Sequence, residues 1–130
     1  MTELKTGLVG HAETIVTESN TAAAVGSGAL PVFSTPNMIA LMESASMKAI
    51  ASCLEEGQGS VGVRIDVEHL AATPLGMRVR AESTLAKVEG RILGFEVKAW
   101  AGDELIGQGT HQRCLVFNGR FMEKTMAKLK

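Results

Sequence analysis

One long apolar helix constrains the fold of this 130-residue chain more than any other feature. Residues 36–54 follow Thr35, a good N-cap, with Pro36 in the first helical position, and Gly57 is expected to cap the helix end. Its apolar residues occupy most of the circumference instead of one stripe: Met38, Ile39, Leu41, Met42, Ala45, Met47, Ala49, Ile50, Ala51, Cys53 and Leu54. Such a helix is buried, so the rest of the domain has to wrap around it.

The remainder of the chain predicts strands for that wrapping. Residues 10–33 read as a strand followed by an irregular segment of small residues, a candidate lid. After the helix, alternation and turn signals predict four strands and a short C-terminal helix, the strands over 60–70, 77–88, 91–101 and 104–117. In the first of these, the side chains expected on one face are Val61, Val63, Ile65 and Val67. This order predicts a single domain over residues 1–130 with an α+β hotdog fold, one long helix wrapped by a curved antiparallel sheet.

Composition excludes several classes of function. Thirteen basic against fourteen acidic residues give a net charge of -1, so the chain lacks the basic field that nucleic acid or anionic lipid would require. Two cysteines without CxxC spacing and three histidines without paired spacing predict no metal site and reduced thiols. With no signal-peptide pattern and no apolar run of about 18 residues, we expect a cytoplasmic protein without a membrane partner.

Three polar residues interrupt the apolar pattern and are candidate catalytic residues. Glu43 lies within the long helix and either points out through a gap in the sheet or acts as a general base or nucleophile. His69 shares the parity of the apolar face of its strand and is either a core histidine bonded to the backbone or a catalytic base. Thr35 is either a structural cap or part of a helix start that polarises a carbonyl group.

Spacing along the helix limits how these residues can cooperate. Thr35 and Glu43 are eight residues apart, which is roughly 12 Å along a helix. Two antiparallel copies of the helix would bring Thr35 of one subunit near Glu43 of the other. The spacing therefore predicts a homodimer with a shared site.

The fourth strand after the helix carries a further candidate. Gly107, Gly109, His111 and Arg113 share one parity in this strand. The glycines permit close approach of a helix or ligand, and Arg113 is either an anion-binding residue or an arginine at the sheet edge.

Four segments carry a resemblance to a known family: VFSTPNMIALMESAS (32–46), GSVGVRIDVEHLAATPLG (59–76), VEGRILGFEVKAW (88–100) and IGQGTHQRCLVF (106–117). Together they resemble the fluoroacetyl-CoA thioesterase-like family of hotdog proteins. The resemblance implies hydrolysis of an acyl-CoA thioester by a homodimer, with further pairing of dimers left open and no metal or other cofactor besides the CoA of the substrate. It implies Thr35, Glu43 and His69 as the catalytic residues, with Gly62 and Arg113 at the acyl site or its support.

The candidate lid departs from that family. The fluoroacetyl-specific enzyme closes its pocket with bulky aromatic residues, whereas GSGALPVF here is mostly small and Phe33 is its only aromatic residue. Phe33 joins Gly62 and Arg113 as a candidate substrate-binding residue. We therefore expect a broader or different acyl group.

Mechanism and function class stay open at this point. Thr35 is a nucleophile or a hydrogen-bond donor to the carbonyl, His69 a general base and then acid, and Glu43 either orients His69 or attacks to give an anhydride. The competing functions are a non-catalytic acyl-CoA-binding module and a hotdog dehydratase acting on hydroxyacyl thioesters.

Overall fold

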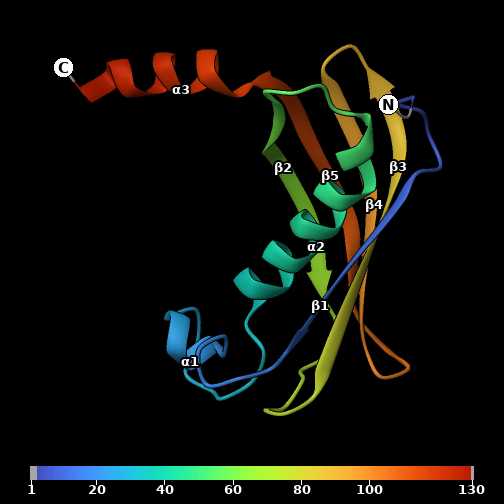
Figure 1. The fold of residues 1–130 in the computed structure, drawn as a ribbon. Helices are drawn as coiled ribbons and strands as arrows, with labels where there is room; N and C mark the ends of the chain where they lie inside the picture. The colour runs from blue at the N-terminus through green and yellow to red at the C-terminus, as the bar shows by residue number, and fades with distance from the viewer. Residues whose placement is uncertain (1–2, 130) are drawn as a thin grey trace.

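The computed structural model describes residues 3–129, which form one antiparallel sheet and one long helix (Figure 1). The five strands lie in the order β1-β3-β4-β5-β2, so β1 and β2 are the edges. The strands are β1 (Val9–Ile15), β2 (Gln58–His69), β3 (Arg78–Glu89), β4 (Ile92–Ala101) and β5 (Glu104–Phe117). The helices are α1 (Ala22–Val25), α2 (Thr35–Ile50) and α3 (Asn118–Met126), with single 3-10 turns at Ala51–Cys53 and Ala127–Leu129.

The long helix α2 lies across one face of the sheet, as Figure 1 shows. Met38, Met42 and Ile50 of α2 are fully buried against apolar side chains of the strands. The largest strand residues in this core are Val79, Leu85, Leu93, Phe95, Val97 and Ile106. The expected α+β hotdog fold is confirmed, and β5 has the predicted bounds.

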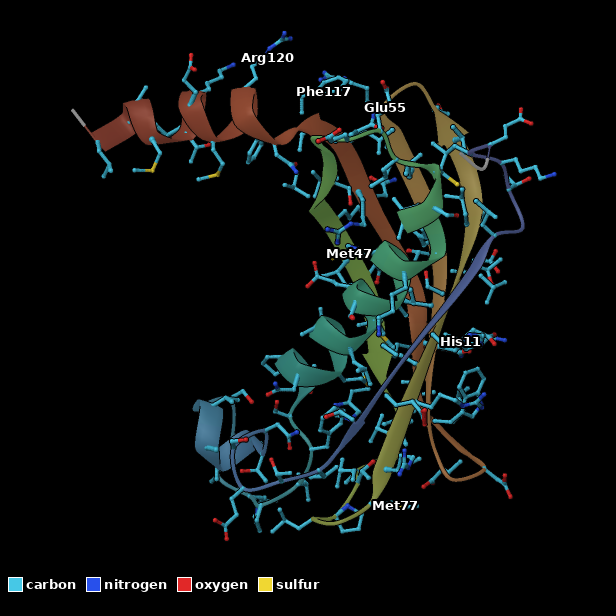
Figure 2. The ribbon with its side chains drawn as sticks, viewed as in Figure 1. His11, Met47, Glu55, Met77, Phe117 and Arg120 are labelled. Atoms are coloured by element: carbon cyan, nitrogen blue, oxygen red, sulfur yellow. The ribbon has the colours of Figure 1, made fainter. Side chains whose placement is uncertain are left out.

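Within the single chain the sheet covers one side of α2. The buried residues of α2 occupy one face: Met38, Met42, Ala45, Ser46, Ala49 and Ile50. Met47, labelled in Figure 2, is 51% exposed, although its side chain is as apolar as those of its buried neighbours in the helix. Five strands of one chain cover only one side of a helix, so the second apolar side of α2 faces solvent within this subunit.

Both predicted ends of α2 differ from the structure. Ser34, not Thr35, is the N-cap, and its Oγ accepts a hydrogen bond from the Asn37 backbone N–H at 3.1 Å. Both residue types cap helices well, and capping by Ser34 leaves the Thr35 hydroxyl free for another partner. The helix ends at Ile50, and Gly57, with φ of 81°, instead shapes the turn before β2.

A β-bulge changes the predicted face of β2. The register with β5 shifts between Gly62 and Arg64, so Val63 is an extra residue without a partner across the ladder. Residues directly opposite each other share a face, and Ile65 lies opposite the buried His111. Val61 lies opposite Cys114, on the other face from Ile65, so the expected common face is wrong. The bulge leaves Ile65, Val67 and His69 on the face that α2 covers.

The C-terminal helix α3 projects away from the sheet and helix layers (Figure 1). None of its residues is buried, and Met122 and Met126 are about half exposed. Within residues 3–129, no helix has the length and apolar character needed to cross a membrane.

Strand β1 passes so close to α2 that only glycine fits at position 10. A Cβ atom built on Gly10 would overlap the Ala45 carbonyl oxygen and the backbone of Ala49. Backbone atoms on both sides leave no flexible group that could move aside, so Gly10 sets the distance between β1 and α2.

We expect Gly10→Ala to lower the free energy of unfolding by roughly 1–3 kcal/mol or more, because α2 must move off β1. Urea unfolding measures the effect. Gly119→Ala is the matched control, since no atom lies within 4 Å of a Cβ there, and it should be neutral or slightly stabilising in α3. Equal stability of the two variants would contradict the close packing.

Candidate active site

Thr35 and His69 form a hydrogen-bonded pair where α2 begins and β2 ends. Thr35 Oγ1 lies 2.7 Å from His69 Nδ1. Thr35 is the first residue of α2, and His69 is the last residue of β2, on the helix-facing side. The alternative of a core histidine bonded to the backbone is therefore wrong, because the partner is a side-chain hydroxyl.

The protonation state of His69 suits a general base. Burial lowers the pKa of His69 below its ordinary value of 6.5, so the imidazole is neutral near pH 7. Its Nε2 is buried and has no hydrogen-bond partner among the described residues. When the Thr35 hydroxyl donates to Nδ1, the proton of the neutral ring is on Nε2, and Nδ1 is ready to receive the hydroxyl proton.

A cavity of about 350 Å³ lies beside this pair, with Thr35, His69 and Phe33 in its wall. The remaining wall is small or aliphatic: Ala22, Ser27, Val32, Leu70, Ala71 and Ala72. The candidate lid thus contributes to the cavity through α1, a single helical turn capped by Thr21. Phe33 is only 1% exposed, so it belongs to the core as well as to the cavity wall.

Glu43 belongs to a second group, formed with Arg113 and His111. Its Oε2 lies 3.5 Å from Arg113 Nη1 and 4.0 Å from His111 Nε2. The Glu43 side chain is 38% exposed, whereas that of Arg113 is 5% exposed. The expectation of an outward-pointing Glu43 is therefore half right: the carboxylate reaches solvent, but a buried cation holds it.

Arg113 is anchored on every nitrogen. Its Nε donates to Ser60 Oγ at 2.8 Å and its Nη2 to the Ser60 carbonyl at 3.0 Å. Its Nη1 lies 3.1 Å from His111 Nε2, in addition to the contact with Glu43. Burial lowers the pKa of Arg113 and Glu43 opposes that shift, but an arginine remains charged near neutral pH. The alternative of an arginine at the sheet edge is wrong, since β5 is an inner strand.

Gly62 leaves room for this second group. A Cβ atom at Gly62 would lie 2.6 Å from Glu43 Oε2, 3.2 Å from His111 Cε1 and 3.5 Å from Arg113 Nη1. A larger residue would displace the Glu43 carboxylate. Gly62 therefore supports the position of Glu43.

The six residues singled out in the sequence thus lie in two groups within one chain. Phe33, Thr35 and His69 line the cavity. Glu43, in the middle of α2, instead lies beside Gly62 of β2 and Arg113 of β5. Sequence reasoning missed the parts played by Ser60 and His111. The shared parity of His111 and Arg113 was a signal for the histidine, but no local pattern marks Ser60.

Comparison with known proteins shows the family of this chain. Residues 16–118 match the family of fluoroacetyl-CoA-specific thioesterases. This chain belongs to that family. A fluoroacetyl-CoA thioesterase of Streptantibioticus cattleyicolor is 45% identical over 100 residues, which is 74% of this chain and 72% of the relative.

Solved structures of similar proteins have the same fold. A structure of the fluoroacetyl-CoA thioesterase FlK has a TM-score of 0.91 at 34% identity and covers 98% of each chain. A thioesterase superfamily member from Thermus thermophilus has a TM-score of 0.88 at 31% identity, covering 99% of this chain and 95% of that one. The likeness extends over nearly the whole chain.

The buried His111 and the partly buried His69 make stability depend on pH. Burial lowers the pKa of both His69 and His111 below 6.5, the value for an unfolded chain. Below about pH 6.5 the unfolded state binds more protons than the folded state, so the free energy of unfolding falls as pH falls.

We expect the wild type to lose stability between about pH 7.5 and about pH 5.5, and a His69→Asn/His111→Gln double variant to lose less over that range. Urea unfolding at the two pH values measures both slopes. A slope that is the same in the two proteins would show that these histidines titrate alike in the folded and unfolded states.

Proposed function

We propose that this protein is an acyl-CoA thioesterase that hydrolyses its substrate to the free acid and CoA. The observation that carries the proposal is the Thr35–His69 pair at 2.7 Å in the wall of a cavity. A hydroxyl bonded to a neutral imidazole is the arrangement that activates a nucleophile for acyl transfer. Membership of a thioesterase family, with a relative named fluoroacetyl-CoA thioesterase, supports the same chemistry.

Two routes fit the pair. In the first, Thr35 Oγ1 attacks the thioester carbonyl while its proton moves to His69 Nδ1, and the imidazolium then protonates the leaving thiolate of CoA. Water, deprotonated by His69, then hydrolyses the acyl-threonine ester. In the second, His69 deprotonates a water that attacks the carbonyl, and Thr35 donates a hydrogen bond to the carbonyl oxygen. The C–S bond then breaks, and the imidazolium protonates the leaving thiolate of CoA. Neither route requires a metal or another cofactor, and CoA enters only as part of the substrate.

We assign Glu43 to the same site through a second subunit. Within one chain Glu43 contacts Arg113 and His111, and His69 Nε2 has no hydrogen-bond partner in residues 3–129. In an antiparallel pair of subunits, Glu43 of one would face His69 of the other. There it would orient the imidazole, or attack the thioester to give an anhydride with release of the CoA thiolate, and water would then hydrolyse the anhydride to the free acid.

Surface features support a homodimer. The edge strand β2 offers an unpaired backbone edge, and Val63 at its bulge is 53% exposed. Met47 on the uncovered side of α2 is 51% exposed. A second copy would bury these groups and complete the covering of α2 that its apolar circumference predicts.

The cavity wall supports a substrate with a broader or different acyl group than fluoroacetyl. Of the described residues in its wall, Phe33 alone is aromatic, and small side chains such as Ala22 and Ala71 leave space beside the reacting pair. We propose that the acyl site accepts larger aliphatic acyl groups.

The reduced thiols expected of Cys53 and Cys114, neither of which is in a disulfide, agree with a cytoplasmic location.

Thiol release from a panel of acyl-CoAs, including fluoroacetyl-CoA and a 3-hydroxyacyl-CoA, tests the activity. We expect turnover by the wild type and a loss of about 100-fold or more in kcat/KM for Glu43→Gln and for His69→Asn. His11→Asn, a change at an exposed histidine of β1, is the control and should retain activity. Binding without turnover would favour the acyl-CoA-binding module, and water loss from the 3-hydroxyacyl substrate would favour the dehydratase.

Mixing two inactive variants tests whether the site is shared. In a heterodimer of Thr35→Ala and Glu43→Gln subunits, one shared site carries both changes and the other carries neither. Random pairing should therefore restore about a quarter of wild-type activity after the two proteins are refolded together. If each site lies within one chain, every site in the mixture keeps one defect, and no activity returns.

A further inference from the structure

His111 is a buried titratable group that neither catalytic route uses. Its side chain is 1% exposed, on the helix-facing side of β5. The imidazole stacks on the Phe95 ring, with centroids 6.1 Å apart and planes 30° apart. Its two nitrogens contact different groups: Nδ1 lies 2.7 Å from the Arg64 carbonyl oxygen, and Nε2 lies 3.1 Å from Arg113 Nη1.

These two contacts determine the tautomer. A carbonyl oxygen only accepts hydrogen bonds, so Nδ1 of His111 carries a proton and donates a hydrogen bond to the Arg64 carbonyl oxygen. A guanidinium only donates, so Nε2 must be the unprotonated nitrogen that accepts from Arg113. A protonated ring would place an N–H of His111 against an N–H of Arg113. Burial and the charge of Arg113 lower the pKa of His111, against the opposing effects of the Arg64 hydrogen bond and Glu43, and this keeps the ring neutral.

The neutral ring controls how Arg113 meets Glu43. Ser60 holds Nε and Nη2 of Arg113, and His111 takes one of the two hydrogens of Nη1. The other Nη1 hydrogen is directed to Glu43 Oε2 across 3.5 Å, longer than an ordinary charge-assisted hydrogen bond. Without an acceptor at His111, that Nη1 hydrogen would have no partner, and the partly exposed Glu43 carboxylate would shift towards it.

The backbone bulge of β2 serves the same arrangement. The register shift lies between Gly62 and Arg64, and the carbonyl that anchors His111 belongs to Arg64. At Gly62, a Cβ atom would crowd both the imidazole and the Glu43 carboxylate. The strand irregularity and the glycine thus both lie against the unit of His111, Arg113 and Glu43.

We propose that His111 is a positioning residue, a neutral imidazole that accepts a hydrogen bond from Arg113 and thereby holds the Glu43 carboxylate at its working distance. This role rests on the proposed function, because it matters only if Glu43 takes part in thioester hydrolysis. It assigns to Arg113 the task of placing a carboxylate and not that of binding a free anion.

Three variants of His111 separate this role from simple packing. His111→Gln places an amide oxygen near the Nε2 position and keeps an acceptor for Arg113. His111→Asn places its amide near the Nδ1 position, where it bonds to Arg64 but does not reach Arg113. His111→Leu fills the volume without either bond.

We expect kcat to fall about 10-fold or more in His111→Asn and His111→Leu, with KM changed by less than about 2-fold, and His111→Gln to retain most of the wild-type kcat. Urea unfolding of each variant shows how much fold stability is lost. A purely structural role would instead make kcat follow stability across the three variants, and that result would overturn the proposal.

The tautomer gives an independent readout in the intact protein. Long-range ¹H–¹⁵N NMR spectra at neutral pH should show a neutral His111 ring protonated on Nδ1, its signals assigned by their absence in His111→Gln. An Nε2-protonated ring or an imidazolium would overturn the proposal even if the enzyme is active. A wild type with no turnover on any acyl-CoA would instead overturn the proposed function, and with it the positioning role.

Discussion

The packing of one face of α2 on the sheet is the contact on which the other features depend. Met38, Met42 and Ile50 are fully buried there, and burial of each such side chain contributes roughly 1.5–3 kcal/mol. Gly10 lets β1 approach the backbone of α2. This contact fixes the position of the helix along the strands and its distance from the sheet. Because α2 is held in this way, its first residue meets the end of β2 and its middle meets β5.

The two groups of polar residues follow from this placement and differ in their electrostatics. Thr35 and His69 form a neutral pair, and burial keeps the imidazole uncharged. Glu43 and Arg113 form a charged pair in which the cation is buried and the carboxylate reaches solvent. Burial of a lone guanidinium would be costly, and Ser60, His111 and Glu43 together compensate for it. The neutral group suits proton transfer, and the charged group suits placement of a carboxylate.

The surface of the subunit reflects the same arrangement. One side of α2 is buried in the core and the other, with Met47, is not, while β2 ends the sheet with an unpaired edge. The proposed dimer uses these features together, since the helix side that remains uncovered also carries the partly exposed Glu43. The uncovered side of α2 and the proposed mechanism therefore both favour the proposed dimer.

The sequence alone determined the long helix, the strands and the residue types of the site. Helical and strand periodicities are local, so they predicted α2 and the bounds of β5. Polar interruptions of the apolar pattern singled out Thr35, Glu43 and His69, and the family resemblance implies the same three residues. The estimate of roughly 12 Å between Thr35 and Glu43 already separated these two along the helix.

Only the tertiary structure decided which groups meet. The bulge at Gly62 moved Val61 to the other face of β2, and Ser34 took the capping role expected of Thr35. The bonds of Arg113 to Ser60 and His111 join residues brought together by strand pairing, and pairing register is not a local property of the sequence. Periodicity shows which face a side chain occupies, but only the packed chain shows what lies opposite that face.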